Sequence, residues 1–159
     1  METQVLIIGG GITGAGIARD LALRGVSCII VEKHDLNAGA SGANHGLLHS
    51  GARYVSTDPG AAQECCLEGM LLKKLAPDCI EDTGGLFIAV KGDDENFISA
   101  FPGLCKKNNI PVQELSVKET LEMEPVLSSN IIAAYHVPDA SVDPFKLTME
   151  NLYQAREYG

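Results

Sequence analysis

Three glycines near the start of the chain have the spacing with which proteins hold a dinucleotide. Gly9, Gly11 and Gly14 match G-x-G-x-x-G within the stretch VLIIGGGITGAGIARD, residues 5–20. In this pattern the first glycine permits a tight turn, the second lets backbone N–H groups approach a pyrophosphate, and the third lets a helix pack closely on a strand. Because the chain contains 17 glycines in 159 residues, chance could produce the spacing, so the surrounding sequence has to support it.

A helix start and an acidic residue supply that support. Ile12 and Thr13 begin a predicted helix, whose N-terminus offers partial positive charge to phosphate groups. Glu32 ends the next predicted strand, about 20 residues beyond the glycines, where a carboxylate accepts hydrogen bonds from an adenosine ribose and repels the 2′-phosphate of NADP. The motif itself leaves NAD and FAD open, and glycines that serve only packing are the alternative.

A βαβ unit has to position these residues. Residues 4–8 form a β-branched run that predicts a short, fully buried strand, and residues 26–31 predict a second one. Between them, residues 12–24 carry Ile17, Ala18 and Leu21 at the spacing of an apolar helix face. Two strands joined by one helix in so short a stretch should be parallel, with a right-handed crossover. The sequence therefore predicts an α/β fold.

The next segment has an unusual composition. Residues 33–57 are rich in Gly, Ala, Ser and Asn, yet they contain Arg53 and Tyr54, which a flexible linker has no reason to carry. Beyond it, helix starts at Asp58, at Asp93 or Asp94, at Ser116 with Glu119 as a capping box, and at Asp143 predict helices over 58–75, 93–108, 116–125 and 143–159. Apolar runs predict strands over 84–90, 111–115 and 131–137. Pro102 interrupts the sequence pattern of the second of these helices, which is still expected to reach about residue 108.

The composition argues against several classes of function. A formal net charge of −9 speaks against nucleic-acid binding, which needs a basic patch. No apolar run approaches the roughly 18 residues of a membrane span, and the N-terminus lacks the basic region of a signal peptide, so a cytoplasmic location is expected. The five cysteines, without a C-x-x-C spacing, predict neither a zinc site nor a disulfide framework, and no metal site is expected.

Longer stretches of the chain carry a family resemblance. GGGITGAGIARDLALRG, VEKHDLNAGASGANHGLLHSGARYV, GGLFIAV and VDPFKLT resemble, in order, the FAD-dependent glycerol-3-phosphate dehydrogenases of the D-amino-acid-oxidase-like flavoprotein superfamily. The stretch NHGLLHSGARY is most similar to the flavin-bearing A subunit of the anaerobic enzymes. The resemblance implies FAD as cofactor and a Rossmann-like FAD-binding domain, with a partial parallel sheet flanked by helices, over 1–83 and 139–159. It implies part of a smaller antiparallel-sheet substrate or cap domain over 84–138.

The resemblance also implies which residues contact the cofactor. They are Gly9, Gly11, Ile12, Thr13, Gly14, Glu32, Lys33, Ser41, Gly42, His45, Gly46, Leu47 and Leu48. Lys33 would lie near the adenosine, and Ser41 and Gly42 would pass the pyrophosphate. Residues 45–48 would run beside the isoalloxazine ring.

Two further residues match family positions on the substrate side of the flavin. Arg53 and Tyr54 are these candidates, and because the family's substrate carries a phosphate, Arg53 is expected to contact that anion. The alternative is that Arg53 tethers its loop to a carboxylate. His45 could likewise be a hydrogen-bonded loop histidine, and for His49 the sequence does not separate a structural role from a functional one. The catalytic base is expected outside residues 1–159.

The activity that the resemblance implies is oxidation of sn-glycerol 3-phosphate to dihydroxyacetone phosphate, by hydride transfer from C2 to flavin N5. Alternatives are a related flavin enzyme acting on a 2-hydroxy acid or amino acid, and a non-catalytic dinucleotide-binding fragment. Family members are several hundred residues long, so the chain is expected to be an N-terminal fragment that is inactive alone. An electron-transfer partner subunit is implied, through which the protein would be peripheral to the inner face of the membrane. The unpaired edge of so short a sheet leads to the hypothesis of a homodimer.

Overall fold

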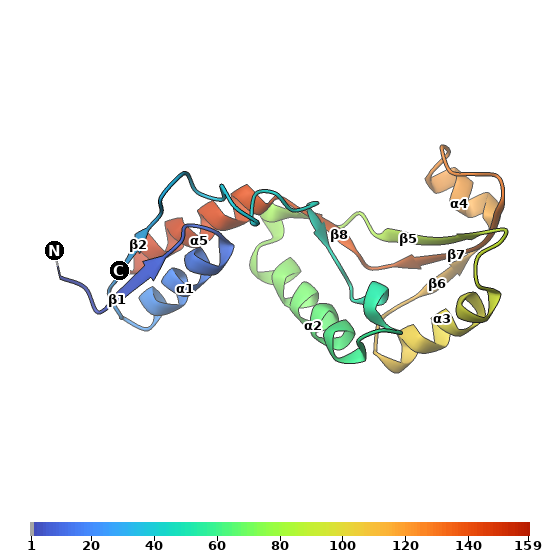
Figure 1. The fold of residues 1–159 in the computed structure, drawn as a ribbon, viewed down its shortest axis with the longest axis horizontal. Coiled ribbons are helices and arrows are strands. Elements are labelled where there is room, and N and C mark those ends of the chain that lie inside the picture. The colour runs from blue at the N-terminus through green and yellow to red at the C-terminus, as the bar shows by residue number, and fades with distance from the viewer. Residues whose placement is uncertain (1) are drawn as a thin grey trace. The chain divides into compact units, whose positions relative to one another are not determined.

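The computed structural model describes residues 2–159, which form two compact units (Figure 1). The first unit runs to Leu47 and resumes over Val142–Gly159, and the second is Leu48–Ser141. The predicted domains change at 83/84 and 138/139 instead. Residues 48–83 pack with the second unit because their apolar side chains share one core with its antiparallel sheet. The functional domain boundaries stay a prediction.

A parallel pair of strands joined by a helix forms the first unit. β1 (Val5–Ile8) pairs in parallel with β2 (Cys28–Val31), and α1 (Ile12–Leu23) connects them. α5 (Pro144–Tyr158) packs beside α1 (Figure 1). The predicted βαβ unit is confirmed, and it brings the glycine motif to the carboxyl end of β1.

Small side chains form the buried face of α1. Gly14, Ala15, Ala18 and Ala22 are buried, whereas Ile17 is 46% exposed. α1 lies against both β2 and α5, and small residues let the backbones approach closely. Of the predicted apolar positions, Ala18 is therefore confirmed as part of the buried face, and Ile17 is not.

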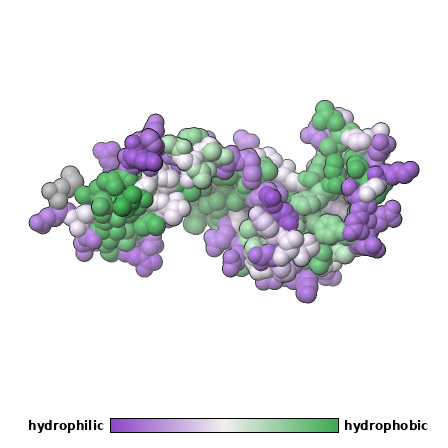
Figure 2. All heavy atoms as spheres, in the orientation of Figure 1, coloured by the Kyte–Doolittle hydropathy of each residue, from purple (hydrophilic) through white to green (hydrophobic). Residues whose placement is uncertain are grey.

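The two parallel strands are less buried than predicted. Leu6 and Ile8 are 57% and 84% exposed, while Ile7 between them is buried, and β2 has no fully buried residue. This alternation is that of strands covered on one face only, since successive side chains point to opposite faces. Figure 2 shows the resulting apolar side chains on the surface of this unit. The prediction of full burial is wrong.

An antiparallel sheet and several helices form the second unit. The sheet has the order β5-β7-β6, with β5 (Gly85–Val90), β6 (Gln113–Leu115) and β7 (Ile131–Val137). The helical elements are η1 (Ala52–Tyr54), α2 (Pro59–Leu75), η2 (Pro77–Cys79), α3 (Glu95–Lys107) and α4 (Val117–Met123). Asp58 and Asp94 cap α2 and α3, and Ser116 forms a capping box with Glu119 at the start of α4, as predicted.

Three short strands lie outside the sequence predictions. They are β3 (Leu47–Leu48), β4 (Ile80–Glu81) and β8 (Ala140–Val142), which pair in the order β3-β8-β4. Strands of two or three residues are too short to carry a periodic pattern, so only pairing reveals them. β3 and β8 contain the positions at which the chain passes from one unit to the other.

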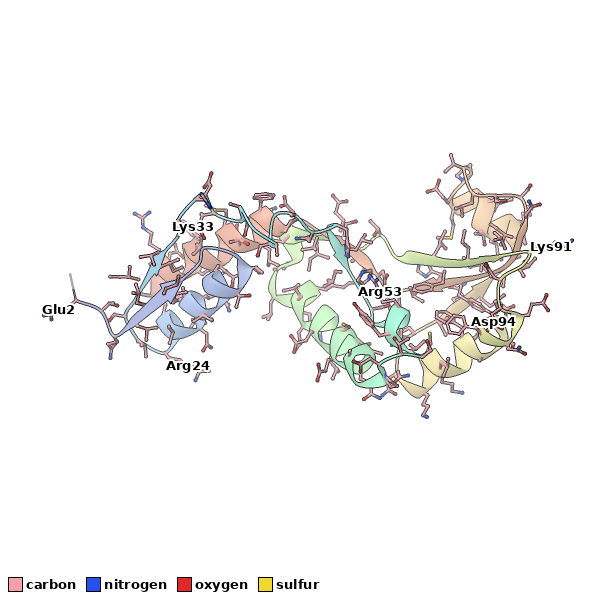
Figure 3. The ribbon with its side chains drawn as sticks, in the orientation of Figure 1. Glu2, Arg24, Lys33, Arg53, Lys91 and Asp94 are labelled. Atoms are coloured by element: carbon pink, nitrogen blue, oxygen red, sulfur yellow. The ribbon has the colours of Figure 1, made fainter. Side chains whose placement is uncertain are left out.

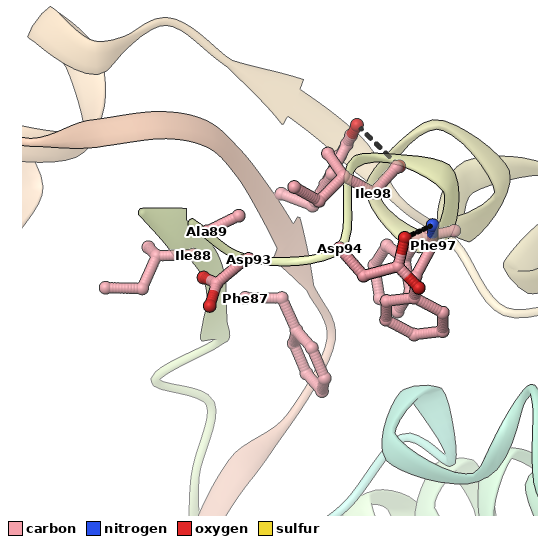
Figure 4. Close-up of a pocket in the computed structure, with 9 residues that line it drawn as sticks. Phe87, Ile88, Ala89, Asp93, Asp94, Phe97 and Ile98 are labelled. Carbon is pink, nitrogen blue, oxygen red and sulfur yellow. Dashed lines mark hydrogen bonds between the residues drawn. The ribbon is translucent and has the colours of Figure 1, made fainter. Parts of the chain in front are cut away.

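Aromatic rings form the centre of the second unit. The Phe101 ring lies 5.1 Å from that of Phe87, 5.3 Å from that of Tyr135 and 5.9 Å from that of Phe97, measured between centroids. A cavity of about 310 Å³ opens among these rings, with Asp93 at its edge (Figure 4). Phe101 is only 2% exposed and is therefore the principal packing residue of this cluster.

Pro102 lies inside α3, and the helix continues through it to Lys107, close to the predicted end at residue 108. Proline has no N–H to donate to the carbonyl four residues earlier, which here belongs to Ile98. The Tyr135 hydroxyl donates to that carbonyl oxygen at 3.2 Å and replaces the missing helical hydrogen bond. A partner from the neighbouring strand thus lets the helix continue through the proline.

Candidate functional site

The glycine turn joins the end of β1 to the start of α1. Gly9 has φ +114°, a conformation that favours glycine, and its N–H donates to the Val31 carbonyl at 2.8 Å. A Cβ at Gly14 would lie 2.1 Å from the Gly9 carbonyl oxygen, so only glycine allows α1 to begin this close to the turn. The structure therefore brings the motif glycines together in one tight turn.

The N-terminus of α1 receives a side chain from a distant loop. Gly11 is the N-cap and offers no side chain, and the first turn contains no acidic residue. Instead, Ser41 Oγ accepts the Ile12 N–H at 3.0 Å, and a Cβ at Gly11 would lie 2.8 Å from that oxygen. The helix provides no acceptor for the next N–H groups, beginning with that of Thr13. This turn can therefore donate to an anionic group, which the partial positive charge of the helix also favours.

Glu32 closes the turn from the end of β2. Its carboxylate accepts the Gly10 N–H at 2.7 Å and the His34 N–H at 2.9 Å. These hydrogen bonds, first that from Gly10, hold the pKa of Glu32 below its ordinary value. The carboxylate is exposed and keeps lone pairs for a further donor such as a ribose hydroxyl. Lys33 follows it and is exposed (Figure 3).

A buried asparagine anchors the loop that carries Ser41. Asn37 is 4% exposed and has φ 60°. Its amide donates to the Pro144 carbonyl at 3.2 Å and accepts from the Thr148 hydroxyl at 3.0 Å, both on α5. A Cβ at Gly42 would lie 2.3 Å from the Asn37 carbonyl oxygen, so that glycine is needed for packing. The sequence analysis did not identify Asn37. The only signal in the sequence is the residue type, because asparagine tolerates the positive φ of a turn.

The segment after this loop is held by local hydrogen bonds. The Asn44 amide donates to the Ser41 carbonyl and accepts the Gly46 N–H, each at 2.6 Å. His45 Nδ1 accepts the Leu47 N–H at 3.1 Å, which gives this exposed histidine a local structural contact. Gly46 has φ +67°, and its carbonyl accepts from Val142. A place beside the flavin for His45, Gly46, Leu47 and Leu48 stays a prediction.

Arg53 lies in the second unit, at the centre of a chain of polar contacts. Its Nη1 donates to His49 Nε2 at 2.8 Å, and His49 Nδ1 lies 3.3 Å from Asp139 Oδ2. The other Asp139 oxygen, Oδ1, accepts the Ser50 N–H at 2.7 Å. Residues from two distant segments, 49–53 and the turn between β7 and β8, therefore meet at one place.

The guanidinium group of Arg53 also lies over an aromatic ring. Its central carbon is 5.3 Å from the centroid of the Tyr54 ring, which packs against the apolar core of the unit. Arg53 is exposed (Figure 3) and forms no ion pair with a carboxylate within residues 2–159. The alternative that it tethers its loop to a carboxylate is therefore not supported over the described part of the chain.

The cysteines differ in accessibility. Cys66, Cys79 and Cys105 are buried, while Cys28 and Cys65 are partly exposed. Burial raises the pKa of the Cys105 thiol to about 11 and raises that of Cys66 as well. We expect a thiol reagent at neutral pH to modify Cys28 and Cys65 first, because a thiolate is the reacting form. Mass mapping after a brief treatment checks this, and early labelling of Cys105 would contradict it.

Two further features concern the described residues as a whole. Within 2–159 there is no group of three or more His, Cys, Asp or Glu side chains placed to hold a metal ion. Nor does any helix in this range have the length and apolar character needed to cross a bilayer.

A family model and several known proteins match this chain. Residues 4–159 match the family model described as FAD dependent oxidoreductase (DAO). The chain is 48% identical over 158 residues to the A subunit of the anaerobic glycerol-3-phosphate dehydrogenase of Escherichia coli K12, covering 99% of this chain and 29% of that protein. It is 48% identical over 157 residues to the corresponding A1 subunit of Haloferax volcanii, covering 98% of this chain and 27% of the relative. The chain thus spans less than a third of the length of these relatives.

Solved structures share the fold. The L-α-glycerophosphate oxidase from Mycoplasma pneumoniae, with FAD bound, matches with a TM-score of 0.83 at 25% identity, over 99% of this chain and 44% of that one. The L-proline dehydrogenase from P. horikoshii matches with a TM-score of 0.83 at 26% identity, over 99% of this chain and 42% of that one. The chain has the glycine turn closed by the carboxylate of Glu32, and it matches the family model over residues 4–159. It therefore belongs to the family of FAD-dependent oxidoreductases.

Proposed function

We propose that this chain supplies the dinucleotide-binding turn and an anion-binding arginine to an enzyme that oxidises sn-glycerol 3-phosphate to dihydroxyacetone phosphate. One observation carries the substrate class: Arg53 is exposed, contacts His49 and the Tyr54 ring, and forms no ion pair with a carboxylate within residues 2–159. A guanidinium in that state is suited to a phosphate, which it can bind through two parallel N–H groups. The 48% identity to glycerol-3-phosphate dehydrogenase subunits supports this choice.

The first unit fits the FAD that the family uses. The glycine turn and the first turn of α1 would donate N–H groups to the pyrophosphate, and Ser41 would keep its loop against the same helix end. Glu32 would accept from the adenosine ribose. When bound, FAD supplies the acceptor for the hydride that leaves C2 of the substrate.

The residues of this chain would act by binding and orientation. Arg53 and Tyr54 would hold the phosphate end of the substrate and so limit the positions that C2 can take. We assign no base within residues 1–159 for the C2 hydroxyl proton. We therefore propose dehydrogenation for the whole protein, to which this chain contributes the cofactor-binding turn and Arg53.

A second candidate has structural support. L-proline dehydrogenase and related amine-oxidising enzymes share the fold, and an arginine also binds a carboxylate in two-point fashion. Steady-state kinetics of the full-length protein with glycerol 3-phosphate, 2-hydroxyglutarate and glycine separate the two candidates. We expect turnover of glycerol 3-phosphate only, and turnover of just the other two would reject the proposal.

Further parts of the proposal concern partners and location. The relatives are named as the A subunit of their enzymes, which supports an electron-transfer partner subunit to which the flavin electrons pass. We place the protein in the cytoplasm, peripheral to the inner membrane face through that partner. The homodimer is a separate hypothesis that rests on the unpaired strand edge, and a monomeric mass by light scattering would count against it.

Changing Glu32 to Gln is expected to weaken FAD binding by about tenfold or more, because hydrogen bonds to a charged group are stronger than those to a neutral one. The neutral amide has one acceptor oxygen where the carboxylate has two, for Gly10, His34 and the ribose. Fluorescence titration with FAD measures the change. Glu64→Gln, an exposed carboxylate on α2, is the control and should bind FAD as the parent does.

The same carboxylate predicts a pH dependence. Its pKa in the folded protein is lowered from 4.5, so its contribution to folding is complete above pH 4.5 and is lost as the pH falls through the lower folded value. We expect the thermal unfolding midpoints (Tm) of the parent and Glu32→Gln proteins to approach each other as the pH falls through the folded pKa of Glu32. A constant difference between them across the acid range would contradict this.

A further inference from the structure

Asn37 lies at the junction of three segments of the first unit. Its backbone N–H donates to the Gly10 carbonyl at 3.3 Å, in the glycine turn. Its side-chain amide donates to the Pro144 carbonyl at 3.2 Å, in the first turn of α5. Its own carbonyl lies against Gly42, where an added Cβ would come within 2.3 Å of the carbonyl oxygen. One residue therefore connects the glycine turn, α5 and the loop that carries Ser41.

The amide of Asn37 is buried together with its partner on α5. Asn37 is 4% exposed and Thr148 is 0% exposed. The Thr148 hydroxyl lies 3.0 Å from Asn37 Oδ1, so both ends of the amide have a hydrogen-bond partner on α5. A buried polar side chain costs free energy unless it is hydrogen-bonded, and these contacts therefore favour one arrangement of the residue over others.

Asn37 also has a backbone conformation that few residue types adopt. Its φ of 60° lies in the left-handed region, which asparagine tolerates better than most residues with a side chain. The contacts with Gly10 and with α5 hold the residue in that conformation. The chain turns at this point, and the residues that follow lead to Ser41 at the start of α1.

This loop delivers a hydroxyl group to the N-terminus of α1. Ser41 Oγ accepts the Ile12 N–H at 3.0 Å. The oxygen is so close to Gly11 that a Cβ there would lie 2.8 Å from it. A displaced loop would leave the Ile12 N–H without this acceptor, since the first N–H groups of a helix have no partner within the helix. The geometry of the helix end thus depends on where the loop is held.

We propose that Asn37 and Thr148 are positioning residues for the pyrophosphate of FAD. They hold the loop of residues 37–42 against the glycine turn before the cofactor binds, so that binding does not have to order it. The passage of the pyrophosphate along this loop rests on the proposed function, to which the two residues that hold the loop are added. A loop ordered in advance binds more tightly, because the apparent dissociation constant rises as the binding-competent fraction of molecules falls.

Changing Asn37 to Gly removes the amide and keeps the backbone conformation, because glycine adopts a positive φ without steric cost. The loop then loses its contacts with Pro144 and Thr148. We expect the affinity for FAD to fall about 10- to 100-fold, as for two lost hydrogen bonds. ADP contains the pyrophosphate and should lose the same factor. Adenosine lacks the pyrophosphate and should bind as it does to the parent.

Variants of Thr148 separate the hydroxyl group from packing. Thr148→Val has nearly the same shape, but it leaves Asn37 Oδ1 without this partner and should weaken ADP binding about tenfold. Thr148→Ser keeps the hydroxyl and should restore most of the affinity. Asn151→Ala is the matched control, because the Asn151 amide donates to the Leu147 carbonyl within α5, and ADP affinity should stay unchanged.

The test uses the full-length protein, freed of FAD, with two measurements. Calorimetric titration with ADP and with adenosine measures binding, and a general loss of structure would weaken both ligands alike. Hydrogen exchange of a peptide that contains Ile12, followed by mass spectrometry without ligand, reports the contact with Ser41. Exchange should be faster in Asn37→Gly and Thr148→Val than in the parent. Should Asn37→Gly fail to fold, the Thr148 variants provide the same comparison.

The outcomes distinguish this role from the proposed function. Equal ADP affinity of the parent, Asn37→Gly and Thr148→Val would overturn the positioning role, even if the glycine turn binds the pyrophosphate. Equal losses for ADP and adenosine, or unchanged exchange at Ile12, would overturn it as well. If ADP binding alone falls but the parent enzyme does not oxidise glycerol 3-phosphate, the positioning role stands and the substrate proposal fails.

Discussion

Replacing Gly14 with Ala is expected to lower FAD affinity about 100-fold or more. The added Cβ would lie 2.1 Å from the Gly9 carbonyl oxygen and 3.2 Å from its carbon, and backbone atoms cannot rotate away as a side chain can. α1 would have to move off β1, taking its first N–H groups away from the pyrophosphate. Two such hydrogen bonds to a charged group, at about 1.5–3 kcal/mol each, account for the loss.

The same helix provides the control. Gly16 lies two residues further along α1, and a Cβ there would meet nothing within 4 Å. Gly16→Ala should therefore bind FAD as the parent does, and it should stabilise the helix by about 0.5–1 kcal/mol because alanine loses less backbone entropy than glycine. FAD titration and thermal unfolding of both variants measure these effects. Equal FAD affinity of Gly14→Ala and Gly16→Ala would refute the role assigned to the turn.

The second large effect concerns the core that supports Arg53. Changing Phe101 to Ala should reduce the free energy of unfolding of the second unit by about 3–5 kcal/mol, the usual cost of removing a buried aromatic ring. Phe101 is 2% exposed and contacts the rings of Phe87 and Tyr135. The cavity of about 310 Å³ already present beside it would be enlarged. Urea unfolding followed by circular dichroism measures the change.

Phe97 is the matched control for this prediction. It lies on the same helix and beside the same cavity, but it is 42% exposed and touches the cluster from one side. Phe97→Ala should cost about 1 kcal/mol, because little apolar area is lost from the interior. If the two variants lost the same stability, Phe101 would not be the centre of the core.

Local signals in the sequence predicted most of the regular elements. The caps at Asp58, Asp94 and Asp143, and the capping box of Ser116 with Glu119, each satisfy the first N–H groups of a helix, as their types and positions indicate. The glycine motif likewise sits between a strand and a helix. Such signals act within a few residues, so a single chain is enough to recognise them.

Other features depended on partners far along the chain. α3 passes through Pro102 because Tyr135, from a strand more than thirty residues later, supplies the missing donor. Ile17 is exposed because α5 needs small neighbours on α1. In each case the sequence around the residue predicts one outcome and a distant contact decides another.

By itself, the sequence determined the βαβ unit, its glycine turn and the acid that closes it, because these follow from residue type and short spacing. It also singled out Arg53, through composition and family resemblance. Only the tertiary structure decided how that arginine is held. His49 and Asp139 are 90 residues apart, and no local pattern predicts that they contact each other, because that depends on which atoms folding brings within hydrogen-bond distance.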